Sequence, residues 1–238
     1  MASKYKISPE RVVFIPVDEP RGDFNNQKSS AFKAYKYAKA IKQIAPQAVL
    51  MANPYDLSNT AVSRNNLKKL AEHFDIIAPY SGQLSPALVK YIKSLKFKEY
   101  WTYNILQKIH KPEAYRRKMW ENLHYGFSPV SPYWHVDQSD GGDAFCSFDV
   151  DTAYGIRRND YATIFADFSN GKGIVSRRQE AHYLGVEDAK IILLCRQLVK
   201  GKPQAEKVEK IIARGAAGDM ETIEKCRDEL LEIALQLK

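Results

Sequence analysis

Short apolar runs alternate with amphipathic segments along the first half of the chain. The apolar runs are rich in Val, Ile and aromatic residues, and each spans only a few residues: "RVVFIPV" (11–17), "AVLMANP" (48–54), "DIIAPY" (75–80) and "EYWTYNI" (99–105). Between these runs and after the last one, apolar residues recur at helical spacing, which predicts helices over about 32–44, 65–74, 86–95 and 112–123. Short buried strands that alternate with amphipathic helices indicate parallel βα units.

Local signals extend this pattern towards the C-terminus. Ser85 and Pro86 have the residue types of a helix N-cap and a first-turn proline. The segment "VSPYWHV" (130–136) predicts a fifth strand, and "YATIFADF" (161–168) predicts one more. A long helix is expected over 176–201, followed by two helices within 201–238. The fold class predicted is therefore α/β with additional C-terminal helices.

Polar and aromatic residues gather where the predicted strands end. In parallel α/β folds, ligand sites form at the carboxyl ends of strands, so these residues are predicted to share one face. Aromatic rings beside carboxylates suit a sugar, whose apolar face stacks on a ring while its hydroxyls need hydrogen-bond partners. The candidates are Asp18 and Glu19 for catalysis, and Asn53, Tyr80, Trp101, Tyr103, Trp134 and Asp137 for substrate binding.

The adjacent acids Asp18 and Glu19 allow three interpretations. Acidic residues ahead of a helix favour its positive end, which would give the pair a purely structural role. A metal site is a second interpretation, but the histidines show no ligand spacing, so we expect no metal and no cofactor. The third is a catalytic acid pair, as glycoside hydrolysis requires.

Composition and charge narrow the class of protein. The chain has 238 residues, of which 45% are hydrophobic, enough for one large domain or two small ones. Its three cysteines are scattered, which favours a reducing compartment over a disulfide framework. No signal peptide or membrane span is apparent, so the sequence as written predicts a cytoplasmic protein with no membrane partner.

The net charge of +8 raises nucleic acid as a partner. The lysines, however, lie mostly on the polar faces of predicted helices, as in "SSAFKAYKYAKAIKQIA". This pattern favours solvated helix faces over a nucleic-acid surface.

Several stretches resemble glycoside hydrolase family 123 and its uncharacterised neighbour family. They are "VDEP" at the end of the first strand, "RRKMWENLHYGF", "PYWHVD" and, most specifically, "SRRQEAHYLGVEDAKIILL". The resemblance runs from about Val12 to about Leu198 and implies a (β/α)8 barrel that acts on 2-acetamido sugars. Residues 1–200 would then be the C-terminal portion of such a barrel, about strands 4 to 8, and 201–238 a helical extension.

The resemblance also implies roles for individual residues. Glu19 would be the general acid and base, and Asp18 would polarise the acetamido group, whose own oxygen attacks the anomeric carbon. Trp134 and Asp137 would lie on the rim near the sugar. The charged residues of the last matching stretch would hold the closing helix against the barrel: Arg177, Arg178, Glu180, Glu187 and Asp188.

Under this resemblance the first three barrel strands have no counterpart in the sequence. An open sheet exposes unpaired backbone groups, so a complementing chain or a second copy is an expected partner, besides the carbohydrate. Three functions therefore stay open: a substrate-assisted glycoside hydrolase, an inactive barrel that binds carbohydrate or pairs with another chain, and a nucleic-acid-binding protein.

Overall fold

The computed structural model describes residues 12–55, 57, 60–104, 106, 110–128, 150–151, 156–157, 163–167 and 170–237. These residues form an α/β protein with seven α-helices and a small parallel sheet of four strands. The chain divides into two compact units, the first ending near Asn104 and the second containing most of the remainder.

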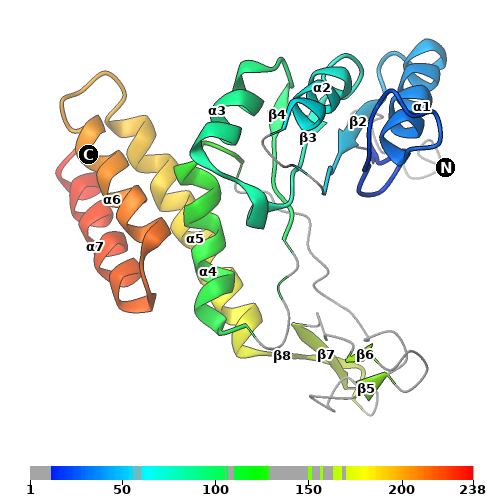
Figure 1. Cartoon of the computed structure of the whole chain (residues 1–238). Coiled ribbons are helices and arrows are strands. Elements are labelled where there is room, and N and C mark those ends of the chain that lie inside the picture. The colour runs from blue at the N-terminus through cyan, green and yellow to red at the C-terminus, as the bar shows by residue number, and fades with distance from the viewer. Residues whose placement is uncertain are drawn as a thin grey trace. The chain divides into compact units, whose positions relative to one another are not determined.

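The first unit is built from βα repeats in chain order, as the alternating pattern predicts. Strands β1 (Val13–Phe14), β2 (Val49–Ala52), β3 (Ile76–Ile77) and β4 (Glu99–Tyr100) pair side by side, and every pair is parallel. Helices α1 (Ser30–Ile44), α2 (Ala61–Leu70) and α3 (Pro86–Ser94) connect them (Figure 1). The strands are shorter than the apolar runs that predicted them.

The helices of this unit begin at side-chain caps. Ser29, Thr60 and Ser85 each accept a hydrogen bond from the backbone N–H three residues ahead, which satisfies one of the free donors of the first turn. Pro86 occupies the first turn of α3, so the Ser85-Pro86 prediction is confirmed. The caps fix where each helix starts and therefore the length of the loop after each strand.

A buried carboxylate joins the strands at their amino ends. Asp75, just before β3, accepts hydrogen bonds from Lys42 Nζ at 2.7 Å and from the Leu50 N–H at 2.9 Å, and it pairs with Lys98 Nζ at 2.7 Å. Burial opposes the charged form, but these donors outweigh it and lower the pKa of Asp75 below its ordinary 3.8. Helix α1 and the starts of β2 to β4 are thus held by one side chain.

The second unit is a bundle of four helices (green to red in Figure 1). Helices α4 (Pro112–His124), α5 (Arg177–Leu198), α6 (Ala205–Ala217) and α7 (Met220–Gln236) confirm the four helices predicted for this part of the sequence. They share one apolar core that includes Trp120, Ile192, Ile212 and Leu230. The predicted extension 201–238 therefore packs in the same core as α4 and α5.

Buried charge and two glycines set how these helices pack. Asp188 on α5 accepts from Arg116 Nε at 2.6 Å and from Trp120 Nε1 at 2.9 Å, both on α4, and pairs with Arg227 on α7 at 3.3 Å. Gly185 faces the Arg116 carbonyl, and Gly215 faces the Trp120 ring, so close that neither site has room for a Cβ atom. Asp188 thus anchors α5 to α4 and α7.

Two short antiparallel pairs and the 3-10 helix η3 (Ser81–Gln83), which lies between β3 and α3, complete the described elements. Strands β5 (Val150–Asp151) and β6 (Ile156–Arg157) form one, and β7 (Ile164–Asp167) and β8 (Lys172–Val175) form the other. The strand predicted at 161–168 exists, but it pairs with β8 in a hairpin instead of extending the parallel sheet. The strand predicted at 130–136 lies outside the described residues.

Candidate functional site

The segments that follow β3 and β4 stay paired beyond the strands themselves. Tyr80, after β3, forms an isolated parallel bridge with Tyr103, after β4. The Ser81 N–H donates to the Tyr103 carbonyl at 2.9 Å, and the Tyr103 N–H donates to the Pro79 carbonyl at 3.1 Å. The side chains that follow these strands are therefore held at one edge of the sheet.

Asn53, after β2, holds the acidic turn that follows β1. Its amide nitrogen donates to Asp18 Oδ1 at 2.6 Å, and its amide oxygen accepts from the Glu19 N–H at 3.2 Å. These two bonds fix the orientation of the amide group, because only one assignment of nitrogen and oxygen satisfies both. Asn53 is buried, whereas the Asp18 side chain is exposed.

The backbone at Glu19 is left-handed. Its φ angle is 44°, and it is the one residue besides glycine with a positive φ in the described part of the chain. Such a conformation costs a residue with a Cβ atom about 1–2 kcal/mol. The hydrogen bond that the Glu19 N–H donates to Asn53 helps to maintain this conformation. Strained backbone of this kind is concentrated at functional sites.

Both oxygens of the Glu19 carboxylate accept hydrogen bonds. The Tyr103 phenol donates to Oε1 at 2.7 Å, and Arg21 Nη2 donates to Oε2 in an ion pair. Burial and the bond to Glu19 raise the pKa of Tyr103 far above its ordinary 10.0, so the phenol remains a neutral donor. The bond to Glu19 likewise raises the pKa of Arg21.

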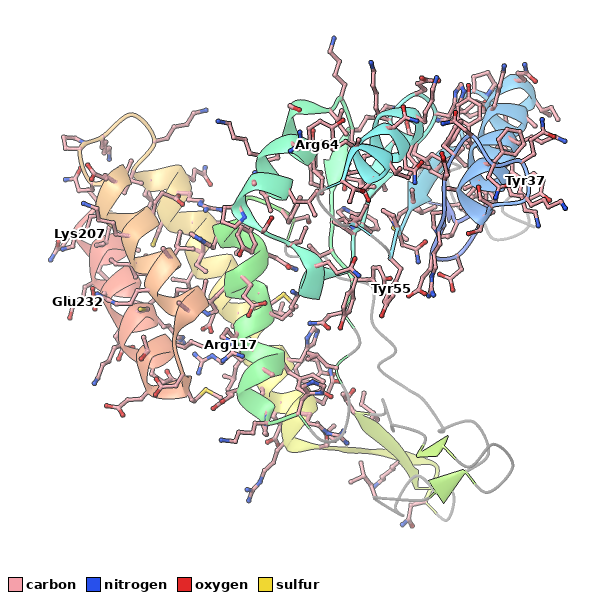
Figure 2. All side chains as sticks on the ribbon, in the orientation of Figure 1. Tyr37, Tyr55, Arg64, Arg117, Lys207 and Glu232 are labelled. Carbon is pink, nitrogen blue, oxygen red and sulfur yellow. The ribbon has the colours of Figure 1, made fainter. Side chains whose placement is uncertain are left out.

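Three tyrosines form a row next to this carboxylate. The ring centroids of Tyr55 and Tyr80 are 5.5 Å apart, as are those of Tyr80 and Tyr103. The Arg21 guanidinium lies over the Tyr55 ring, 4.3 Å from its centroid (Tyr55 is labelled in Figure 2). Contacts therefore run in a closed ring from Glu19 through the three tyrosines to Arg21 and back.

Gly82 positions the middle ring of the row. A Cβ atom at residue 82 would lie 2.8 Å from Tyr80 Cε1, so any larger residue would push the Tyr80 ring aside. The tyrosine row thus depends on a glycine that is not itself part of it.

The structure brings together five of the residues predicted from the sequence: Asp18, Glu19, Asn53, Tyr80 and Tyr103. The described contacts of Trp101 lie elsewhere: it packs on the cluster of Met51, Ile76 and Ala78, and its indole N–H donates to Glu99 at 2.6 Å. Trp134 and Asp137 lie outside the described residues.

Sequence reasoning missed Arg21 and Tyr55. Each lies two residues beyond a predicted site residue, in a loop whose course depends on contacts with distant segments. The available signal was proximity in sequence to Glu19 and Asn53, which does not say where a side chain points.

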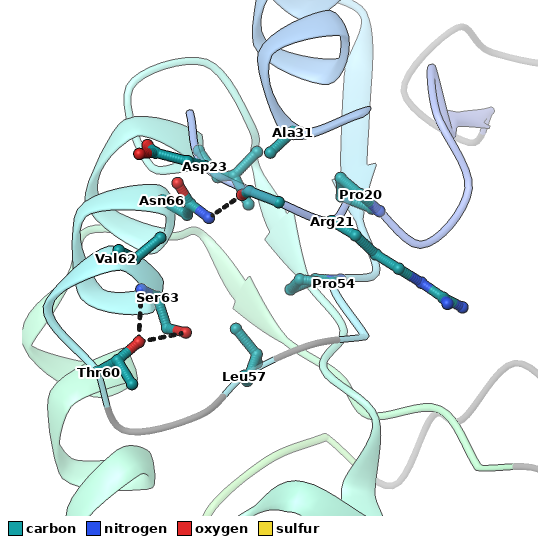
Figure 3. A pocket seen from close by; sticks show the side chains of 12 residues that line it. Pro20, Arg21, Asp23, Ala31, Pro54, Leu57, Thr60, Val62, Ser63 and Asn66 are labelled. Atoms are coloured by element: carbon teal, nitrogen blue, oxygen red, sulfur yellow. Dashed lines mark hydrogen bonds between the residues drawn. The ribbon is translucent and has the colours of Figure 1, made fainter. Parts of the chain in front are cut away.

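A small pocket lies behind the acidic turn. It has a volume of about 120 Å³ and lies between residues 20–23 and α2, and Asn66 Nδ2 on α2 donates to the Gly22 carbonyl at 2.7 Å (Figure 3). Pockets for drug-sized ligands span about 300–1,000 Å³, so this one is too small for that class. The Arg21 side chain points away from it (Figure 3).

The described residues include no cluster of three or more His, Cys, Asp or Glu side chains suited to a metal ion. In the same residues, no helix has both the length and the apolar character needed to cross a membrane.

No protein-family model matches the chain, and no curated protein does.

Proposed function

We propose that this protein acts on 2-acetamido sugars as a glycoside hydrolase of the substrate-assisted, retaining type. The observation that carries the proposal is the meeting of Asp18 and Glu19 with Asn53 and Tyr103 at the carboxyl ends of parallel strands. A polar site with an adjacent acid pair, an amide and a row of aromatic rings has the groups that a sugar ring and its substituents need.

In this mechanism the substrate supplies its own nucleophile. The acetamido oxygen attacks the anomeric carbon, the bond to the leaving oxygen breaks, and that oxygen takes a proton from Glu19. Asp18 accepts a hydrogen bond from the acetamido N–H and stabilises the positive charge of the cyclic intermediate. A water molecule then attacks the anomeric carbon and opens the cyclic intermediate, and Glu19 takes a proton from that water. Asn53 supports the mechanism by holding both acidic residues in one turn.

The parallel sheet is compatible with part of a (β/α)8 barrel. Its strands follow one another in chain order, which is the arrangement of consecutive barrel strands. Among the strands of the described residues, β1 is an edge of this sheet, and Phe14 and Ile15 are exposed there, with exposed fractions of 47% and 46%. A strand from a complementing chain or from a second copy would cover this edge. Light scattering that shows a monodisperse monomer would argue against pairing between copies.

A second candidate function is carbohydrate binding without catalysis. The observation that favours it is the ion pair between Arg21 and Glu19, which occupies an oxygen that a general acid needs for its proton. A protein that only binds sugar has no such requirement. The two candidates predict sugar binding equally and differ in turnover.

A comparison of two substrates tests the hydrolase. Glu19→Gln is expected to slow hydrolysis of a 2-acetamido sugar with a poor leaving group by roughly 10²–10⁴-fold, because general acid catalysis typically contributes that much. An activated aryl glycoside needs less proton donation and should lose less. Asp18→Asn should slow both substrates alike, because both routes share the cyclic intermediate. If wild-type protein turns over the aryl glycoside and Glu19→Gln changes neither rate, the assignment of Glu19 is wrong.

A further inference from the structure

Arg21 combines a fixed backbone with an exposed side chain. Its N–H donates to Ser30 Oγ at 2.7 Å, and its carbonyl accepts from the Ala31 N–H at 3.0 Å, so the backbone is tied to the first turn of α1. The side chain, in contrast, has an exposed fraction of 53%. Arg21 can therefore exchange its partner without any rearrangement of the fold.

The guanidinium is oriented before any ligand arrives. The contact with the Tyr55 ring and the ion pair with Glu19 restrain the guanidinium, whose N–H groups all lie in its plane. The described bond to Glu19 uses one of five such donors. A guanidinium held in this way is suited to bind a carboxylate, sulfate or phosphate through two parallel hydrogen bonds.

The present partner of Arg21 is one that the chemistry must remove. Glu19 cannot pass a proton from Oε2 to a leaving oxygen while Arg21 donates to that same atom. An ion pair at the surface is worth only about 0–1 kcal/mol. A competing anion can therefore replace Glu19 as the partner of Arg21 at little cost in free energy. A neutral sugar forms weaker hydrogen bonds with the guanidinium and replaces Glu19 less readily.

We propose that Arg21 is the specificity-determining residue of this site, and that it recognises a negatively charged substituent on a 2-acetamido sugar. The substituent replaces Glu19 as the partner of Arg21, so binding of the correct sugar frees Oε2 for proton transfer. Without Arg21, the carboxylates of Asp18 and Glu19 would repel such a sugar. The inference rests on the proposed action on 2-acetamido sugars and adds the charge of the substrate.

Calorimetric titration of the full chain at low ionic strength tests the inference. The probes are N-acetylglucosamine, its 6-sulfate, N-acetylmuramic acid, which carries a carboxylate, and inorganic sulfate alone. The wild-type protein should bind at least one of the charged sugars about tenfold or more tightly than the neutral one, a difference of about 1.4 kcal/mol. Arg21→Gln should abolish this preference, and Arg21→Lys should restore only part of it, because an ammonium group cannot form the paired hydrogen bonds.

Arg64→Gln is the matched control. Arg64 on α2 also lies over a tyrosine ring, 5.3 Å from the centroid of Tyr91 (Arg64 is labelled in Figure 2). Its replacement removes the same charge and the same kind of stacking from the same unit. The preference for charged sugars should survive in this variant, and circular dichroism should show that both variants keep the wild-type fold.

The outcomes separate this inference from the function on which it rests. Equal affinity for neutral and charged sugars in the wild-type protein would overturn the role of Arg21 and leave sugar binding intact. If Arg21→Gln and Arg64→Gln weaken the preference for charged sugars equally, the preference is a general charge effect and the role of Arg21 is overturned. If sulfate alone binds as tightly as the sulfated sugar, the sugar ring contributes nothing to binding, and recognition of a charged sugar is overturned. Binding of none of the three sugars would overturn the proposed function itself.

Discussion

The phenol of Tyr103 donates a hydrogen bond of 2.7 Å to Oε1 of Glu19, a residue 84 positions away in the sequence. The bond ties the turn after β1 to the end of β4, so it spans the whole parallel sheet. It also fixes one carboxylate oxygen of Glu19 and leaves the other to Arg21.

A double-mutant cycle should measure this bond. Tyr103→Phe removes the donor and little else, and Glu19→Ala removes the acceptor. Hydrogen bonds to charged groups typically contribute about 1.5–3 kcal/mol. We expect a coupling near the lower value, because the Glu19 side chain is partly exposed. Urea denaturation of the two single variants and the double variant checks it, and strictly additive losses would contradict a direct bond.

Asn53→Asp should destabilise the protein more than the same change at Asn66. Each asparagine donates through Nδ2, but Asn53 donates to the Asp18 carboxylate and Asn66 to a neutral carbonyl. The new carboxylate at residue 53 would face a like charge, at a cost on the order of 1–3 kcal/mol beyond the lost bond. The measurement is the denaturant midpoint of each variant at neutral pH and in acid. The difference in midpoint between the two variants should become smaller in acid, where the carboxylates are protonated. A difference that does not change with pH would exclude repulsion between the carboxylates at residues 18 and 53.

Glycine at residue 19 should be better tolerated than alanine. Both changes remove the carboxylate and its bonds, but only alanine keeps a Cβ atom in the left-handed backbone. Glu19→Gly should therefore be the more stable of the two by roughly 1 kcal/mol. Thermal or urea unfolding of the two proteins decides the matter, and a more stable alanine variant would mean that this backbone is not strained.

The pH dependence of stability should carry the signature of Asp75. The pKa of Asp75 is lowered in the folded protein, so its stabilising contribution is complete above its ordinary value of 3.8 and is lost as the pH falls through the lower folded value. Asp75→Asn should cost on the order of 3 kcal/mol at neutral pH, because Lys42 loses its buried partner. It should also flatten the loss of stability below about pH 5.

Glu232→Gln serves as its control. Glu232 lies on α7, and its side chain is exposed. In this variant the urea midpoint should decrease with falling pH as it does in the wild-type protein. If the stability of Asp75→Asn decreases with falling pH as steeply as that of the wild-type protein, other carboxylates govern the loss of stability in acid.

Gly215→Ala should disrupt the helical bundle. The added Cβ atom would overlap Cε3 of Trp120, a ring that is fully buried. Overpacking of this kind typically costs about 1–3 kcal/mol. A Trp120→Phe background removes the obstructing ring atoms, so the alanine should cost less there. Equal cost in both backgrounds, measured by chemical denaturation, would contradict the clash.

Local sequence signals predicted the elements well and the site only in part. Ser85 and Pro86 identified the start of α3 because a cap depends on residues within one turn. Strand order placed Asp18, Asn53 and Tyr103 at one edge, because a parallel arrangement sends every carboxyl end the same way. The partners of Arg21 were out of reach, since the loop that carries it is shaped by Asn53 and by the first turn of α1.

The separation of Asp75 from the acidic turn has an evolutionary consequence. The clamp of Lys42, Asp75 and Lys98 secures the strands at their amino ends, while Asp18 and Glu19 lie beyond the carboxyl end of β1. Substitutions in the loops after β1 to β4 can therefore change which ligand is bound, while selection for stability acts on other positions. A lineage carrying this sheet would be free to diverge in what it recognises long before it diverged in shape.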